Sequence, residues 1–169
     1  MKTSWLRLVL TRELSSFCDE LALFPDEARI WEVVPGVSNS AGTLALHVCG
    51  NLQHFVGAVL GDTGYVRNRP LEFSTRGVPR SALTVEIRRT VQVVDSTLSG
   101  LPEEALLAEY PDVLGGLRVP TGLFLVHLSG HLAHHLGQAG YLRRALTGEN
   151  RSSGALAIGA LGTAPANGS

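Results

Sequence analysis

Four of the six histidines lie within nine residues of one apolar, helix-compatible segment, from His127 to His135. An α-helix turns about 100° and rises ~1.5 Å per residue, so His127, His131 and His135 form one stripe with about 6 Å between neighbours. Two imidazoles at this spacing can bind the same metal ion. Nitrogen ligands of this kind suit Zn, Ni, Co, Fe or Cu, and spacing alone does not choose among these metals.

The spacing leaves the identity of the ligand pair open. His127 with His131, His131 with His135, and His131 with His134 all satisfy the geometry. Ordinary hydrogen bonds usually satisfy a single buried histidine, but several imidazoles buried together without partners would be costly. The density of the cluster therefore favours a metal site. Because two ligands make a weak site, a third must come from another element.

Apolar residues recur at steps of three and four in four segments, which predicts amphipathic helices over residues 3–24, 40–61, 80–99 and 120–147. Strand-like alternation is scarce. The sequence therefore predicts an all-α fold, specifically a four-helix bundle, in one domain over residues 1–148. Ligand sites in such bundles are built from side chains that project inward from facing helices. The third ligand is expected on a helix that faces residues 120–147.

Long loops are expected after the second and third helices. Residues 65–79 show too little periodicity for a helix, and we expect a connecting loop there. Prolines and paired glycines in residues 101–120 predict a short helical turn at 102–107, followed by loop with an extended piece near 117–119. Residues 149–169 are rich in Gly, Ala and Ser and are predicted to form a flexible C-terminal tail.

Composition excludes several classes of function. The chain has 169 residues, a formal net charge of −1 and no long run of one sign, which argues against a nucleic-acid partner. Its two cysteines, Cys18 and Cys49, form no close-spaced pair, so neither a Cys-rich zinc site nor a disulfide framework is expected. No uninterrupted apolar run indicates a signal peptide or a membrane span. We therefore expect a soluble cytoplasmic protein without a membrane partner.

The two histidines outside the cluster, His47 and His54, both lie on the predicted helix 40–61. His47 borders the apolar stripe of that helix and is the better candidate for the third ligand, whereas His54 lies closer to the helix end. A pair from residues 120–147 together with His47 would make a three-histidine site with an open position. Such a site is typical of a catalytic metal and not of a closed structural one.

Two motifs carry a resemblance to a known family. The first is the run His131-Leu132-Ala133-His134-His135-Leu136-Gly137-Gln138, followed by Tyr141-Leu142-Arg143. It resembles the final-helix motif of the DinB/YfiT-like metalloenzyme superfamily. The second is His47-Val48-Cys49-Gly50-Asn51-Leu52-Gln53-His54-Phe55, running into Arg67-Asn68-Arg69-Pro70-Leu71-Glu72-Phe73. It is similar to a bacterial branch of that superfamily whose function is unassigned.

The resemblance covers about residues 3–147, and it implies a four-helix bundle that is often dimeric. It also implies a divalent metal bound by one histidine of the second helix and the HxxxH pair of the last. Carried over, the ligands are His47, His131 and His135, with Zn or Ni as the favoured metal, and the chain is expected to form a homodimer. His127 and His134 fall outside this ligand set.

A metal with an open position lowers the pKa of a bound water or thiol, which creates a nucleophile near neutral pH. Leu132 follows His131, so the glutamate of a metalloprotease HExxH motif is missing. Characterised relatives include thiol transferases, so the resemblance implies that a low-molecular-weight thiol is activated to attack a small-molecule electrophile. A hydrolase that activates water is an alternative enzyme. The competing non-enzymatic hypothesis is a stress-associated metal-binding or dimerisation module.

Several polar residues near the motifs are candidate partners of a cofactor or substrate. Asn51 lies one turn after His47 and can orient a ligand or satisfy a backbone group. Arg67 and Arg69 can hold an anionic cofactor, although charges in a loop are more often solvated. Glu72 is predicted to form a surface salt bridge in preference to acting as a base or metal neighbour. Gln138, three residues after His135, is a candidate neighbour of the site, and no catalytic residue is assigned.

Overall fold

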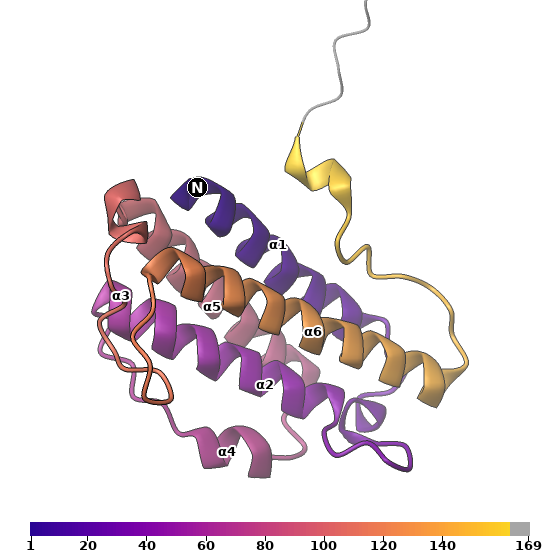
Figure 1. Ribbon diagram of the computed structural model, residues 1–169. Coiled ribbons are helices and arrows are strands. Elements are labelled where there is room, and N and C mark those ends of the chain that lie inside the picture. The colour runs from indigo at the N-terminus through magenta and orange to yellow at the C-terminus, as the bar shows by residue number, and fades with distance from the viewer. Residues whose placement is uncertain (163–169) are drawn as a thin grey trace, which may run out of the picture.

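The computed structural model describes residues 1–162, and over that range all regular secondary structure is helical (Figure 1). Two isolated β-bridges, Glu109 with Pro120 and Leu114 with Leu117, are formed within residues 109–120, and no strand is present in the described range. The all-α prediction is confirmed. An extended piece was predicted at 117–119, and the structure forms only these isolated bridges there.

The predicted helices are found close to their expected bounds. They are α1 (Thr3–Ala22), α2 (Ala41–Leu52), α5 (Arg80–Gly100) and α6 (Thr121–Thr147). Helix α2 continues without a break through a π-helical turn, η2 (Gln53–Ala58), into α3 (Val59–Gly61). Three short 3-10 turns lie outside them: η1 (Ala28–Trp31), η3 (Glu103–Leu106) and η4 (Ile158–Leu161). The turn η3 matches the one predicted at 102–107.

The predicted loop at 65–79 is wrong in one respect, because it contains helix α4 (Arg69–Ser74). Asn68 caps this helix, since its side-chain oxygen accepts a hydrogen bond from the backbone N–H of Leu71 at 3.3 Å. Pro70 stands in the first turn, where a missing N–H costs nothing. Six residues are too few to show the 3.6-residue repeat of apolar side chains. The only sign of this helix in the sequence was therefore Asn68 followed by Pro70.

One core runs between the four long helical segments. Helix α1 packs against α5 and α6, and α2 packs against α4, α5 and α6. Phe17 of α1, Ile87 of α5 and Leu132 of α6 are among its fully buried side chains. In Figure 1, α6 lies across the face formed by α1 and α2. Residues far apart in the sequence therefore meet along the contact between α2 and α6.

The segment Ala41–Gly61 is long and apolar enough, by length and a mean hydropathy of 1.2, to pass the test for a membrane span. The sequence analysis expected no apolar segment that could span a membrane, and this helix is an exception by length and composition. Buried residues make up 61% of the apolar window, however, because α2 packs against three other helices. A core helix of this composition passes the same test, so its apolar character is accounted for by packing.

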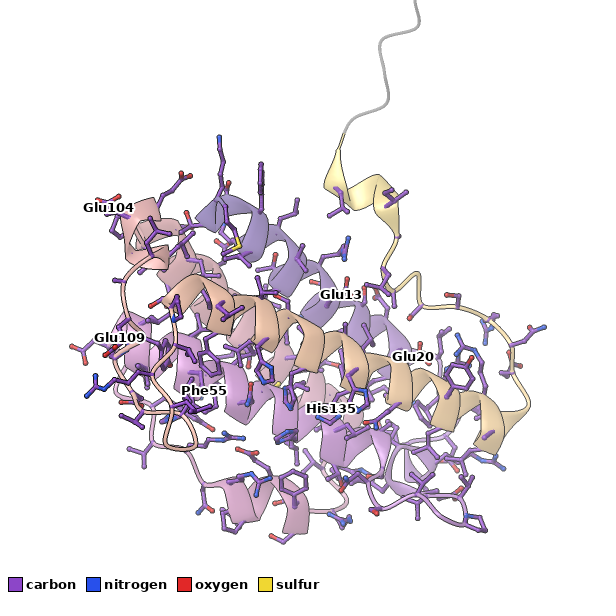
Figure 2. The ribbon with its side chains drawn as sticks, in the orientation of Figure 1. Glu13, Glu20, Phe55, Glu104, Glu109 and His135 are labelled. Atoms are coloured by element: carbon purple, nitrogen blue, oxygen red, sulfur yellow. The ribbon has the colours of Figure 1, made fainter. Side chains whose placement is uncertain are left out.

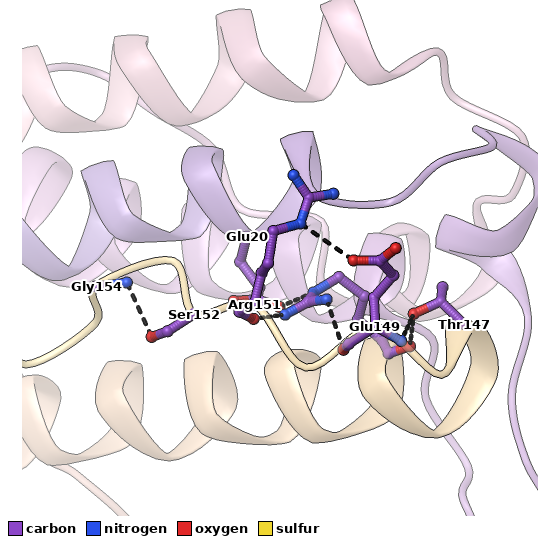
Figure 3. Close-up of polar contacts among 7 residues, drawn as sticks. Glu20, Thr147, Glu149, Arg151, Ser152 and Gly154 are labelled. Carbon is purple, nitrogen blue, oxygen red and sulfur yellow. Dashed lines mark hydrogen bonds and ion pairs between the residues drawn. The ribbon is translucent and has the colours of Figure 1, made fainter.

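The C-terminal end of α6 is held by a buried ion pair. Arg143, which is fully buried, binds the carboxylate of Glu20 on α1 through its Nε. Its other guanidinium nitrogens donate to the backbone carbonyls of Glu149 and Arg151, and Figure 3 shows these residues gathered around the contact. The first residues after α6 are therefore bound to the helix. The rest of the predicted tail includes residues 163–169, which lie outside the described residues.

We expect Arg143→Ala to destabilise the protein by about 3–5 kcal/mol, because the carboxylate of Glu20 would be left buried without a counter-charge. Urea unfolding followed by circular dichroism measures this. Arg151→Ala is the matched control, because the ion pair of Arg151 with Glu149 is exposed, and it should cost less than about 1 kcal/mol. Equal losses in the two variants would contradict the assignment of Glu20 and Arg143 as a stabilising pair.

Candidate metal centre

Three imidazoles from two helices meet between α2 and α6. The Nε2 atom of His131 lies 3.2 Å from Nε2 of His47 and 3.1 Å from Nε2 of His135. All three ligand atoms lie within 4.8 Å of one another. Figure 2 shows His135 on the side of α6 that faces α2. The structure thus brings together the three residues that the resemblance assigned as metal ligands.

Local sequence explains why these rings converge. Leu128, Leu132 and Leu136 of α6 are buried in the core, and the stripe containing His131 and His135 lies beside them on the helix. The two rings therefore border the contact with α2. On α2, Ser40 caps the helix by accepting a hydrogen bond from the N–H of Thr43 at 3.1 Å. This cap fixes the start of the helix, and the packing of α2 against α4 and α6 places His47 between Glu72 and His131.

Glu72 of α4 lies behind His47. Its Oε2 is 2.9 Å from Nδ1 of His47, and an ionised carboxylate can only accept, so Nδ1 of His47 carries the proton. In a neutral ring, Nε2 then presents a lone pair to the cluster. The contact requires a glycine at position 50, because a Cβ on Gly50 would lie 2.2 Å from Oε1 of Glu72. Gly50 thus leaves the space that Glu72 occupies.

Arg67 holds Glu72 in its ionised form. Nε of Arg67 donates to Oε1 at 2.7 Å, and Nη2 donates to Oε2 at 2.9 Å. Burial acts to raise the pKa of Glu72, but the hydrogen bonds from Arg67 and His47 outweigh it and lower the pKa below its ordinary value. The prediction of a surface salt bridge for Glu72 is therefore wrong, since Glu72 is only 6% exposed. Arg67 is likewise not a solvated loop charge.

Gln138 plays the corresponding part for His135. Nδ1 of His135 lies 2.8 Å from the amide oxygen of Gln138, so Nδ1 donates and Nε2 is left with its lone pair. An outer hydrogen bond of this kind fixes the tautomer and the ring orientation of a metal-binding histidine. Both of the outer rings of the cluster therefore direct an unprotonated Nε2 inward.

The charge state of the cluster fits a cation. Burial, followed by the nearby charge of His135 and His47, lowers the pKa of His131 to about 4, and burial also lowers the pKa of His135. His131 can donate one Nε2 proton at most, to one of its two close neighbours, which leaves the lone pair of the other neighbour without a donor. A metal ion would accept all three lone pairs. Two nitrogens at ~2.0–2.1 Å from one tetrahedral Zn²⁺ are about 3.3 Å apart, close to the 3.2 and 3.1 Å that separate Nε2 of His131 from those of His47 and His135.

The remaining histidines stay outside the cluster. His127 is exposed and stacks on His131 with 6.4 Å between ring centroids, and His134 is exposed with its centroid 5.2 Å from that of His135. His54 packs against the ring of Phe55. The structure thus resolves the ambiguity of the spacing in favour of His131 and His135 as the pair that meets His47.

The candidate cofactor-binding residues occupy different positions. Asn51 is buried, and its side-chain oxygen has no hydrogen-bond partner among the described residues. Arg67 already uses Nε and Nη2 on Glu72. Arg69 is exposed and lies over the ring of Phe73, 5.0 Å from its centroid, and that ring is 4.8 Å from the ring of His47. Arg69 is therefore the arginine that remains available near the cluster.

Sequence reasoning missed the role of Glu72 and the contact of Phe73 with His47. Both belong to α4, which was predicted to be loop. The available signal was Gly50, a glycine in the middle of an otherwise continuous helix, which often marks a close approach by another group.

Compared with models of known protein families and with curated proteins, the chain matches none. A proposal of function therefore relies on the geometry of the site and on the resemblance of the two sequence motifs.

We expect Glu72→Gln to weaken Zn²⁺ binding about 10- to 100-fold, because His47 would lose the carboxylate that fixes its tautomer. Competition with a chromophoric chelator measures the affinity. Glu86→Gln is the matched control, because Glu86 lines the same cavity beside α4 but contacts Gln53 and not His47. Equal Zn²⁺ affinity in the two variants would show that Glu72 does not position His47.

Proposed function

We propose that the protein binds one divalent metal ion per chain at His47, His131 and His135, with Zn or Ni favoured, and that this site activates a low-molecular-weight thiol for attack on a small-molecule electrophile. As part of the same proposal, the chain belongs to the DinB/YfiT-like superfamily and folds as a four-helix bundle. It forms a homodimer and is located in the cytoplasm. The packing of α1, α2, α5 and α6 around one core supports the bundle.

The observation that carries the proposal is the convergence of three Nε2 atoms, two of which belong to rings that hold their protons on Nδ1. Glu72 and Gln138 accept hydrogen bonds from the Nδ1–H groups of His47 and His135. A cluster built only for hydrogen bonding would place a donor opposite each acceptor, whereas here acceptors face one another. When bound, a divalent cation would supply charge that lowers the pKa of a coordinated thiol or water.

The chain's own thiols are poor nucleophiles. Burial raises the pKa of Cys49 to about 12, and partial burial raises the pKa of Cys18. Neither is ionised near neutral pH, and neither belongs to the histidine cluster. A thiol nucleophile must therefore be supplied by a separate molecule.

A thiol suits this site better than water does. The carboxylate that contacts the cluster, Glu72, is held by Arg67 and His47 and is not free to accept a proton from water. A free thiol has a pKa of about 8.5, against about 15.7 for water, so a thiol needs less assistance to ionise. Arg69 and Asn51 are the residues available to bind polar groups of that thiol, with Arg67 acting mainly through Glu72.

We expect protein purified without a chelator and without a histidine tag to contain about one metal ion per chain, and His47→Ala, His131→Ala and His135→Ala to lose it. Elemental analysis measures the content. His54→Ala and His134→Ala are matched controls that should retain the metal, because both rings lie outside the cluster. Metal-free wild-type protein, together with unchanged stability in the first three variants, would refute the metal site.

With metal-loaded protein we expect turnover of 1-chloro-2,4-dinitrobenzene in the presence of one member of a panel of low-molecular-weight thiols. The sulfur forms a bond to the ring carbon as chloride leaves, and the thiol proton passes to solvent. His131→Ala should lower the rate at least about 100-fold. Ester or amide hydrolysis without thiol dependence would favour the hydrolase instead. A full complement of metal with neither reaction would favour the non-catalytic module.

A further inference from the structure

A cavity of about 490 Å³ lies between the C-terminal half of α6 and the loop that precedes α2. In Figure 1 this loop lies beside the end of α6. Val34 and Val37 of the loop, Leu44 of α2 and Leu142 of α6 line the cavity with apolar surface. Its volume falls within the range of about 300–1,000 Å³ that is typical of small-molecule sites.

The lining of this cavity carries no Asp, Glu, Lys, Arg or His. The cavity is open to solvent on one side, and a charged ligand would lose part of its hydration there without gaining a counter-charge, which is unfavourable. The polar groups that do line it are neutral, and they include the side chains of Ser38, Asn39 and Gln138. The chemistry of the lining therefore selects a neutral ligand with a large apolar part.

Gln138 belongs both to this cavity and to the surroundings of the histidine cluster. Its amide oxygen accepts a hydrogen bond from Nδ1–H of His135, and its amide nitrogen makes no hydrogen bond with the described residues. An amide nitrogen carries two donor hydrogens, so it can serve an acceptor on a ligand without disturbing His135. The cavity therefore has apolar walls, and the amide nitrogen of Gln138 is available to orient a ligand.

We propose that this cavity is a binding site for a neutral, largely apolar small molecule whose hydrogen-bond acceptor accepts from the amide nitrogen of Gln138. The site is separate from the histidine cluster, and binding in it requires no metal. A ligand bound to Gln138 would be connected to a metal ion through the hydrogen bond between Gln138 and His135, and only this connection rests on the proposed function.

The apolar walls are tested by a fluorescence titration with the neutral probe N-phenyl-1-naphthylamine. Ala145 is exposed on α6 and lines the cavity, so Ala145→Trp should fill it and weaken probe binding at least about tenfold. Ala82→Trp is the matched control, because Ala82 is exposed on α5 and does not line the cavity. It should bind the probe as the wild type does. Val37→Trp fills the cavity from the loop and should reproduce the loss if Ala145→Trp proves unstable.

Competition tests the selectivity for neutral ligands. Naphthalene-2-methanol should displace the probe at concentrations at least about tenfold lower than 2-naphthoate or the ammonium form of 2-naphthylmethylamine. His131→Ala should lose the metal and keep probe binding, so failure of the cavity and failure of the metal site are distinguishable.

Three results would overturn the proposal. The first is probe binding that is equally tight in Ala145→Trp, Val37→Trp and the wild type. The second is equal competition by the neutral and charged naphthalenes. The third is a dimer in sedimentation that Ala145→Trp dissociates, with no probe bound by the wild type, which would make this face a contact between two copies of the chain.

Discussion

The carboxylate of Glu72 is the interaction on which the histidine cluster depends, because it binds His47 of α2 and Arg67 before α4 at the same time. Its oxygens are shared between Arg67 and the Nδ1–H of His47, and Gly50 leaves the space in which they meet. A buried carboxylate is tolerated because it is both charge-compensated and fully hydrogen-bonded. Without it, the proton of His47 could reside on Nε2, where it would point into the cluster and oppose a cation.

Helix α6 is held in register by contacts that do not touch the cluster. Leu128, Leu132 and Leu136 pack into the core, and Arg143 binds Glu20 of α1 near the end of the helix. A change of one residue in register would turn the histidine pair by about 100° away from α2. The distances within the cluster are therefore a consequence of core packing and of an ion pair elsewhere on α6.

The two outer contacts of the cluster differ in charge. His47 donates to an ionised carboxylate, whereas His135 donates to the neutral amide of Gln138. An anionic partner makes an imidazole a stronger electron donor, so a metal ion would gain more electron density from His47 than from His135. The neutral partner faces an uncharged cavity, and the charged partner is balanced by Arg67. The charged partner, Glu72, therefore lies beside a charged residue, and the neutral partner, Gln138, lies beside a cavity without charged residues.

The sequence by itself determined the long helices and the histidine stripe, because both depend on a period of 3.6 residues that is local to the chain. It also ranked His47 above His54, since only His47 borders the apolar stripe of its helix. It could not determine the geometry of the centre, because His47 and His131 are 84 residues apart and meet only when α2 packs against α6. Helix α4 was missed because it is too short to show a period, and Glu72 and Phe73 were missed with it. Tertiary structure alone decided that Glu72 is buried behind His47, because burial depends on contacts between segments that no local pattern records.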